Sequence, residues 1–185
     1  MKKLLIVVDY QNDFVDGTLG FSGAELLDER IAAKIDAYRE AGDEIAFTLD
    51  MHGRDYLDTL EGANLPVEHC IEGTPGAELF GMVAERVKAC DPVFEKPTFG
   101  SKELFGRLVA MQKVADEVGT KPFESIEFVG LVSNICVIAN AVLAKTACPE
   151  VPIIVDAACT DSFDKELQDK AFDVMEGLHI QVINR

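Results

Sequence analysis

The chain has 185 residues, of which 33 are acidic and 17 basic, and its formal net charge is −16. With 48% hydrophobic and 27% charged residues, its composition is that of a globular protein and excludes a disordered or fibrous one. The negative charge repels phosphate backbones and anionic lipids, so we expect neither nucleic acid nor a membrane as a partner. At this length we expect one domain over residues 1–185.

The beginning of the chain and its cysteines bear on the compartment. Only five apolar residues, Leu4 to Val8, precede Asp9, whereas the apolar core of a signal peptide needs about 7–15. The five cysteines are odd in number and have no paired spacing, which is typical of reduced thiols. We therefore expect a cytoplasmic protein.

The first half of the chain alternates short apolar runs with amphipathic segments. Leu4–Val8 predicts a strand buried on both faces, and the apolar spacing within Ala24–Ala41 predicts a helix that Gly42 ends. Glu44–Leu49 predicts the next strand. Thr74–Ala89 predicts a helix, with Thr74 as its N-cap and proline in the first turn.

The second half continues the alternation. The sequence predicts strands over Pro92–Glu95, Ile126–Leu131, Val151–Val155 and Ile180–Ile183, and helices over Lys102–Val118, Ile135–Lys145 and Asp164–Glu176. This order predicts an α/β fold with a mostly parallel six-stranded sheet and helices on both faces.

Reactive side chains gather at the predicted strand ends. Asp9, Asp50 and Lys96 end the first three strands, and Cys136 follows the fourth. Ligands of open parallel sheets bind outside the carboxyl ends of the strands. Taken singly, such an Asp is usually a loop cap and such a Cys a small buried apolar residue. Their convergence at one edge favours an active centre.

Cys136 is the candidate nucleophile because it lies where a strand turns into a helix. The positive end of a helix favours thiolate, and free backbone N–H groups there can receive an oxyanion. A nearby Lys96 would lower the thiol pKa further, and Asp9 could take or return a proton. No histidine follows a strand at a comparable place, which disfavours a Cys–His pair.

A candidate metal site lies in the long aperiodic stretch between Met51 and Gly73, which contains two of the three histidines. Asp50 and His52 stand two apart at a strand end, His69 follows, and Glu61 is an additional candidate ligand, directly or through water. Carboxylate and imidazole suit Zn²⁺, Fe²⁺ or Mn²⁺. Solvated loop histidines would give the same short pattern, so both interpretations stay open at this point.

Three segments together resemble the isochorismatase-like cysteine hydrolase superfamily: Asp9-Tyr10-Gln11-Asn12-Asp13-Phe14, Glu95-Lys96-Pro97-Thr98-Phe99-Gly100-Ser101 and Gly130-Leu131-Val132-Ser133-Asn134-Ile135-Cys136-Val137. The resemblance implies a Rossmann-like fold and a catalytic triad of Asp9, Lys96 and Cys136. It also implies a non-proline cis peptide bond before Val132 and an oxyanion hole made by the N–H groups of Val132 and Cys136.

Within the superfamily, Asp50-x-His52 together with His69-Cys70-x-x-Gly73-Thr74-Pro75-Gly76-Ala77-Glu78 resembles the nicotinamidase/pyrazinamidase branch. This implies hydrolysis of a small amide, nicotinamide, to nicotinate and ammonia through a cysteine thioester. It also implies a divalent metal at Asp50, His52 and His69, with zinc favoured over iron or manganese, that orients the pyridine ring. Phe14 is either a ring-packing residue or an ordinary core residue, and the resemblance implies a homo-oligomer.

Two other functions remain open from the sequence. One is a different cysteine amidase of the superfamily that acts on a ureido or carbamoyl compound. The other is a non-catalytic, metal-stabilised binding protein, which would have no need for Asp9, Lys96 and Cys136 together.

Overall fold

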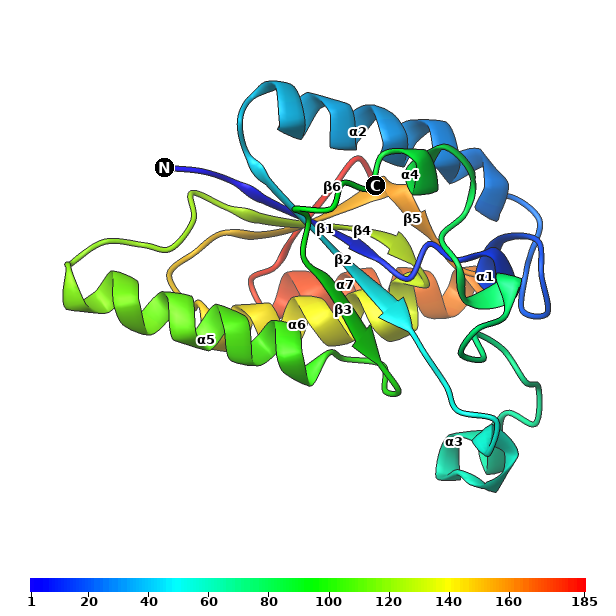
Figure 1. Cartoon of the computed structure of the whole chain (residues 1–185). Coiled ribbons are helices and arrows are strands. Elements are labelled where there is room, and N and C mark those ends of the chain that lie inside the picture. Colours follow the sequence, from blue (N-terminus) through cyan, green and yellow to red (C-terminus); the bar gives the residue numbers. More distant parts are fainter.

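The computed structural model describes all residues from Met1 to Arg185 and contains one parallel sheet between two layers of helices (Figure 1). The strands are β1 (Leu4–Val8), β2 (Glu44–Asp50), β3 (Val93–Lys96), β4 (Ile126–Leu131), β5 (Ile153–Asp161) and β6 (Gln181–Ile183). They lie in the order β3-β2-β1-β4-β5-β6, and every neighbouring pair is parallel. The predicted α/β architecture is confirmed.

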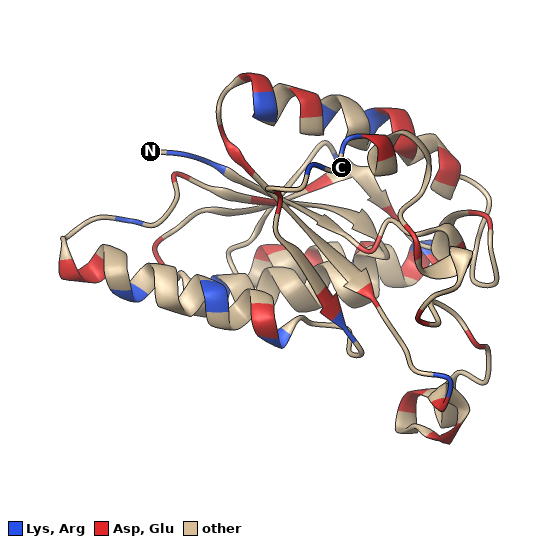
Figure 2. Cartoon of the chain, viewed as in Figure 1, with Lys and Arg blue, Asp and Glu red and all other residues tan.

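Helices cover both faces of the sheet (Figure 1). The helices are α1 (Asn12–Val15), α2 (Asp28–Glu40), α3 (Leu60–Asn64), α4 (Gly81–Glu85), α5 (Lys102–Glu117), α6 (Ile138–Ala147) and α7 (Lys165–Gly177). α2 and α4 lie on one face and α5, α6 and α7 on the other, whereas α3 projects away from the sheet (Figure 1). Acidic residues are spread over both helical layers and over α3 (Figure 2).

The alternation of β1 explains why the sheet needs both layers. Leu4, Ile6 and Val8 belong to the buried cluster beneath α5, α6 and α7, while Leu5 and Val7 belong to the cluster beneath α2. Successive side chains of a strand point to opposite faces, so a fully apolar strand must be covered twice. None of the helices combines the length and the apolar composition that crossing a bilayer requires.

β1 and β4 approach closely beside the site. Gly130 of β4 has a φ of +105°, and a Cβ there would lie 2.0 Å from the carbonyl oxygen of Val8. Only glycine fits such an approach without displacing the neighbouring strand. Gly130 therefore allows the residues that follow β1 and β4 to meet.

The predicted helix over Thr74–Ala89 is wrong. The structure has a 3-10 turn at Pro75–Ala77, an isolated bridge from Leu79 to Gln11, and the short helix α4. Asp28 accepts hydrogen bonds from the N–H groups of Met82 and Val83, so the helix begins only at Gly81.

The strands Leu4–Val8 and Ile126–Leu131 have the predicted bounds, and the other predicted elements are present with shifted bounds. A 3-10 turn, Ala24–Leu27, precedes α2, and a π-helical turn, Ser133–Val137, precedes α6. β5 extends to Asp161, beyond the predicted end at Val155, and α1 and α3 were not predicted. Four residues form α1, too few for a helical period to be visible in the sequence.

Candidate active site

The sheet order brings four chain segments to one point. β1 lies between β2 and β4, so the chain crosses to opposite sides of β1 at the switch point where open α/β sheets bind ligands. Asp9 follows β1, Asp50 ends β2, Lys96 ends β3, and Cys136 lies in the π-helical turn after β4. All four side chains are almost fully buried.

Lys96 connects the first acid to the thiol. Its Nζ lies 2.6 Å from Oδ2 of Asp9 and 3.6 Å from Sγ of Cys136. Thr48 of β2 donates a hydrogen bond of 2.6 Å to the other oxygen of Asp9. Asp9 itself has a φ of +46°, an uncommon backbone conformation outside glycine that is found at functional sites. The structure thus places an acid, a cation and a nucleophile in contact.

Burial dominates the protonation of this group. Burial, reinforced by Asp9, raises the pKa of the Cys136 thiol well above its ordinary value, and Lys96 only partly opposes the shift. Burial also raises the pKa of Asp9, although Lys96 and Thr48 favour its charged form. The lowered thiol pKa expected from the sequence is therefore not found. Burial therefore favours the neutral thiol, and it makes the Asp9 carboxylate a stronger base than an exposed one.

The peptide bond between Leu131 and Val132 is cis, as the resemblance implied. Val132 and Cys136 both line the same cavity. No acceptor within the protein takes the Val132 N–H. This leaves a backbone donor available beside the thiol.

A second cluster adjoins the first through Asp50. Oδ1 of Asp50 lies 3.5 Å from Lys96 Nζ, and Oδ2 lies 3.0 Å from Nε2 of His52 and 3.4 Å from Nε2 of His69. Glu61 Oε1 lies 3.9 Å from both of these nitrogen atoms. The candidate ligand atoms of the four residues all lie within 4.8 Å of one another.

The four residues suit a divalent metal in chemistry and orientation. His69 Nδ1 is 2.8 Å from the carbonyl oxygen of Val67, which leaves Nε2 directed into the cluster. Burial opposes the charge of Asp50, but the two histidines and Lys96 outweigh it and lower its pKa. Burial raises the pKa of Glu61, which is half-buried and thus the least fixed of the four.

Polar residues that the sequence analysis did not single out hold these groups in place. Gln11 donates to the carbonyl oxygen of Asp50 and accepts from its N–H, at 2.8 and 2.7 Å. Asp13 accepts a hydrogen bond of 2.7 Å from the N–H of Cys70, beside His69. Asn140 bonds to the carbonyl oxygens of Cys136 and Phe99, and so ties α6 to the loop after β3. The signal for Gln11 and Asp13 was their place directly after the first strand.

The two clusters open onto a cavity of about 380 Å³. Its wall contains the acidic residues Asp50 and Glu61, and neither lysine nor arginine lines it. The ring of Phe14 lies in the wall, 5.6 Å from that of His69. The remaining lining residues are mostly apolar: Leu19, Phe21, Leu65, Phe99, Val132, Ile135 and Phe163. The cavity therefore suits an uncharged or cationic molecule.

Cys70, which follows His69, is buried, and burial raises the pKa of its thiol. Its Sγ is not among the candidate metal-ligand atoms, so Cys70 packs beside the cluster without belonging to it. All five cysteines are unpaired.

Comparison with known proteins gives a consistent result. A family model described as the isochorismatase domain matches residues 3–185. No curated protein matches significantly. The structure is similar to that of a nicotinamidase from Bacillus subtilis, with a TM-score of 0.81 and 27% identity over 98% of this chain and 99% of the other.

Two more distant structures show the same fold. One is a pyrazinamidase from Pyrococcus horikoshii in complex with zinc, with a TM-score of 0.80 and 22% identity over 100% of both chains. The other is an N-carbamoylsarcosine amidase from Thermoplasma acidophilum, with a TM-score of 0.72 and 21% identity over 98% of this chain and 95% of the other.

Proposed function

Because the chain belongs to the isochorismatase family of hydrolases, we propose that residues 1–185 form one amidase domain that converts nicotinamide to nicotinate and ammonia. Asp9, Lys96 and Cys136 are the catalytic residues of this proposal. The similarity to the nicotinamidase from Bacillus subtilis supports this choice of substrate. The unpaired cysteines support a reducing compartment, the cytoplasm.

The first chemical step is attack of Cys136 Sγ on the amide carbon. Burial favours the neutral thiol, so in this mechanism its proton leaves as the carbon–sulfur bond forms, and Asp9 is the base that takes it. Asp9 then gives this proton to the departing nitrogen, and ammonia leaves as the carbon–nitrogen bond breaks. Lys96, in contact with both partners, balances the negative charge throughout.

The carbonyl oxygen becomes negative in this step and needs donors. The N–H of Val132, which has no acceptor in the protein, and that of Cys136 are the proposed pair. Water then attacks the thioester carbon, with Asp9 accepting a proton from that water and returning it to sulfur. The products are nicotinate and the restored thiol.

Asp50, His52 and His69 would hold the divalent metal, with Glu61 as a fourth ligand, directly or through water. The metal would supply an electrophile that binds the pyridine nitrogen and so orients the amide. Phe14 would pack against the ring from the same wall of the cavity. Zinc is the favoured ion, given the donor set of imidazole and carboxylate.

The observation that carries the proposal is the contact of Asp9, Lys96 and Cys136 at a cavity without lysine or arginine in its wall. Isochorismate carries two carboxylates, and apart from the metal that Asp50, His52 and His69 would hold, the wall offers neither lysine nor arginine to pair with them. Nicotinamide is uncharged, and its ring suits the apolar wall.

Ammonia release from nicotinamide tests the proposal. The protein is first treated with a chelator, and Zn²⁺, Mn²⁺ or Fe²⁺ is then added back. We expect metal-dependent turnover with a kcat/KM above about 10⁴ M⁻¹s⁻¹, the lower end of the usual enzyme range. If no metal gives turnover although the Cys136 thiol still reacts with iodoacetamide, nicotinamide is not the substrate. The assignment of Cys136 as a reactive cysteine would remain.

Replacing His52 with alanine should remove bound metal and raise the KM for nicotinamide. Loss of a residue that merely supports a metal ligand costs about 10–100-fold in metal affinity, so loss of a ligand should cost at least as much. Metal content by mass spectrometry and steady-state kinetics measure the two effects. His179→Ala is the matched control, because His179 lies outside the cluster. Equal metal content in both variants would contradict the assigned ligands.

A further inference from the structure

A second cavity of about 900 Å³ adjoins the catalytic one. The two cavities share five lining residues: Glu61, Leu65, Phe99, Ile135 and Phe163. The second cavity continues between the segment around α3 and the loop after β3, past Tyr56, Leu60 and Pro97. A molecule held at Cys136 can therefore extend past the shared residues into this second space.

Two large apolar side chains in the wall that both cavities share are unusually exposed to solvent. Phe99 is 50% exposed and Phe163 is 63% exposed, although both are large and apolar. Leu60, which lines the second cavity but not the first, is 82% exposed. A group of exposed apolar side chains around a concave site indicates a surface that is covered when a ligand binds.

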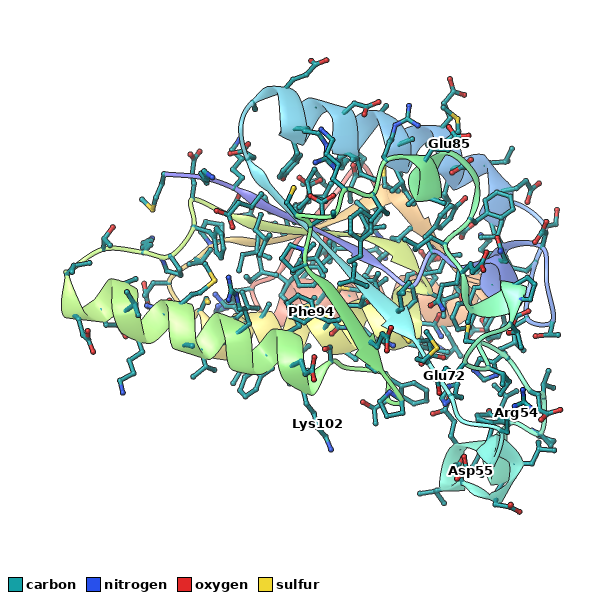
Figure 3. The ribbon with its side chains drawn as sticks, in the orientation of Figure 1. Arg54, Asp55, Glu72, Glu85, Phe94 and Lys102 are labelled. Atoms are coloured by element: carbon teal, nitrogen blue, oxygen red, sulfur yellow. The ribbon has the colours of Figure 1, made fainter.

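The charges of the second cavity repeat those of the first. Its lining includes the acidic residues Asp55 and Glu61 and neither lysine nor arginine. Asp55 lies on the projecting segment before α3 (Figure 3). Beyond the candidate metal ligands, no lysine or arginine in the lining can pair with an anionic group.

The size of the joined space exceeds the need of a one-ring amide. The catalytic cavity alone, at about 380 Å³, lies within the range of about 300–1,000 Å³ that holds drug-sized ligands. A single pyridine carboxamide at Cys136 would leave the second cavity, of about 900 Å³, unfilled.

We propose that this enzyme acts on aromatic amides larger than nicotinamide, whose uncharged apolar part passes Ile135 and covers Phe99 and Phe163. The inference rests on the proposed amidase function, because the carboxamide must reach Cys136. The second cavity then determines specificity by apolar contact. Fused-ring and aryl-substituted pyridine carboxamides belong to this class, and amides with a carboxylate on the distal part do not.

Three amides test the proposal on the metal-loaded protein: nicotinamide, quinoline-3-carboxamide and 5-carboxynicotinamide. Quinoline-3-carboxamide keeps the pyridine nitrogen and the carboxamide of nicotinamide and adds one apolar ring. We expect its kcat/KM to equal or exceed that of nicotinamide, and that of the carboxylated amide to be at least tenfold lower than that of nicotinamide. A kcat/KM for the bicyclic amide tenfold below that of nicotinamide would overturn the inference and leave the proposed function intact.

A substitution in the second cavity gives an independent measurement. Leu60→Asp places a charge there at the first residue of α3, where an acidic side chain is compatible with the helix. The ratio of kcat/KM for the bicyclic amide to that for nicotinamide should fall about fivefold, the effect of losing part of an apolar contact. Leu26→Asp, exposed on another part of the chain, should leave the ratio unchanged. An equal ratio in both variants would contradict the assigned path.

Binding separates the two proposals if no amide is hydrolysed. Calorimetry with the metal-loaded Cys136→Ala variant measures affinity without turnover. Binding of quinoline-3-carboxamide at least as tight as that of nicotinamide would support the larger ligand class even where the nicotinamidase proposal fails. Weaker binding by tenfold, or none, would overturn it.

Discussion

Replacement of Cys136 by alanine is expected to lower the rate of ammonia release from nicotinamide by about 10⁴-fold or more, the scale seen when a catalytic nucleophile is removed. No other thiol can substitute. The cavity that holds Cys136 is lined by no second cysteine, and Cys70, Cys148 and Cys159 are buried elsewhere. Because alanine is smaller and apolar, the backbone of the π-helical turn should persist.

Three measurements make this experiment decisive. Steady-state ammonia release gives the rate, circular dichroism and urea unfolding report the fold, and mass spectrometry gives the metal content. Cys148→Ala is the control for loss of a buried thiol, and it should retain activity. A Cys136→Ala protein that is folded, metal-loaded and within tenfold of the wild-type rate would contradict thioester catalysis.

Replacement of Lys96 by methionine should lower kcat by about 10²–10³-fold, the range for one electrostatic group in a closed site. Methionine keeps the length of the side chain and removes its charge. Asp9 then lies buried without its cation, and the Cys136 thiol loses the one neighbour that favours thiolate. Leaving a buried charge unpaired typically costs about 3–5 kcal/mol of stability, so unfolding must be measured beside kinetics.

The sign of the pH effect distinguishes this role from a merely structural one. Lys96 acts to lower the pKa of the thiol, against the larger effect of burial, so its removal should raise that pKa further. The rate at which iodoacetamide alkylates Cys136 should therefore begin to rise at a higher pH in Lys96→Met than in the wild type. Lys102→Met, exposed at the start of α5 (Figure 3), is the control. Coincident alkylation profiles for Lys96→Met and wild type would contradict the electrostatic role.

The strand ends could be predicted from the sequence because the relevant signals are local. A continuous apolar run such as Leu4–Val8 by itself predicts a strand buried on both faces. The residue after the run is then expected at the end of that strand. The rule for parallel sheets then brings Asp9, Asp50 and Lys96 to one edge without further information.

The segment from Thr74 to Ala89 shows why other parts could not be predicted. Thr74 and Pro75 are good helix-starting residues, and the sequence pattern after them is amphipathic. Instead, Leu79 forms an isolated bridge with Gln11. Gly76 packs so closely against Asp13 that a Cβ at Gly76 would lie 2.1 Å from the Asp13 carboxylate. These contacts join residues about sixty positions apart, and local helix propensity cannot predict them.

The thiol pKa was mispredicted for a related reason. Position at a helix start and a neighbouring lysine both favour thiolate, and both are visible in the sequence. The depth of burial and the contact with Asp9 are not visible, since they depend on how β1 and β4 lie side by side. In the structure they outweigh the first two effects.

The place of β1 in the sheet has a consequence for synthesis of the chain. β1 leaves the ribosome before both of its hydrogen-bonded partners, β2 and β4, and β4 begins only at Ile126. Until then one side of an entirely apolar strand lacks its partner, which is the situation that exposes nascent chains to aggregation. A ribosome stalled near residue 100 would hold Asp9 and Lys96 but no active centre, and such a chain should require a chaperone to stay available for folding.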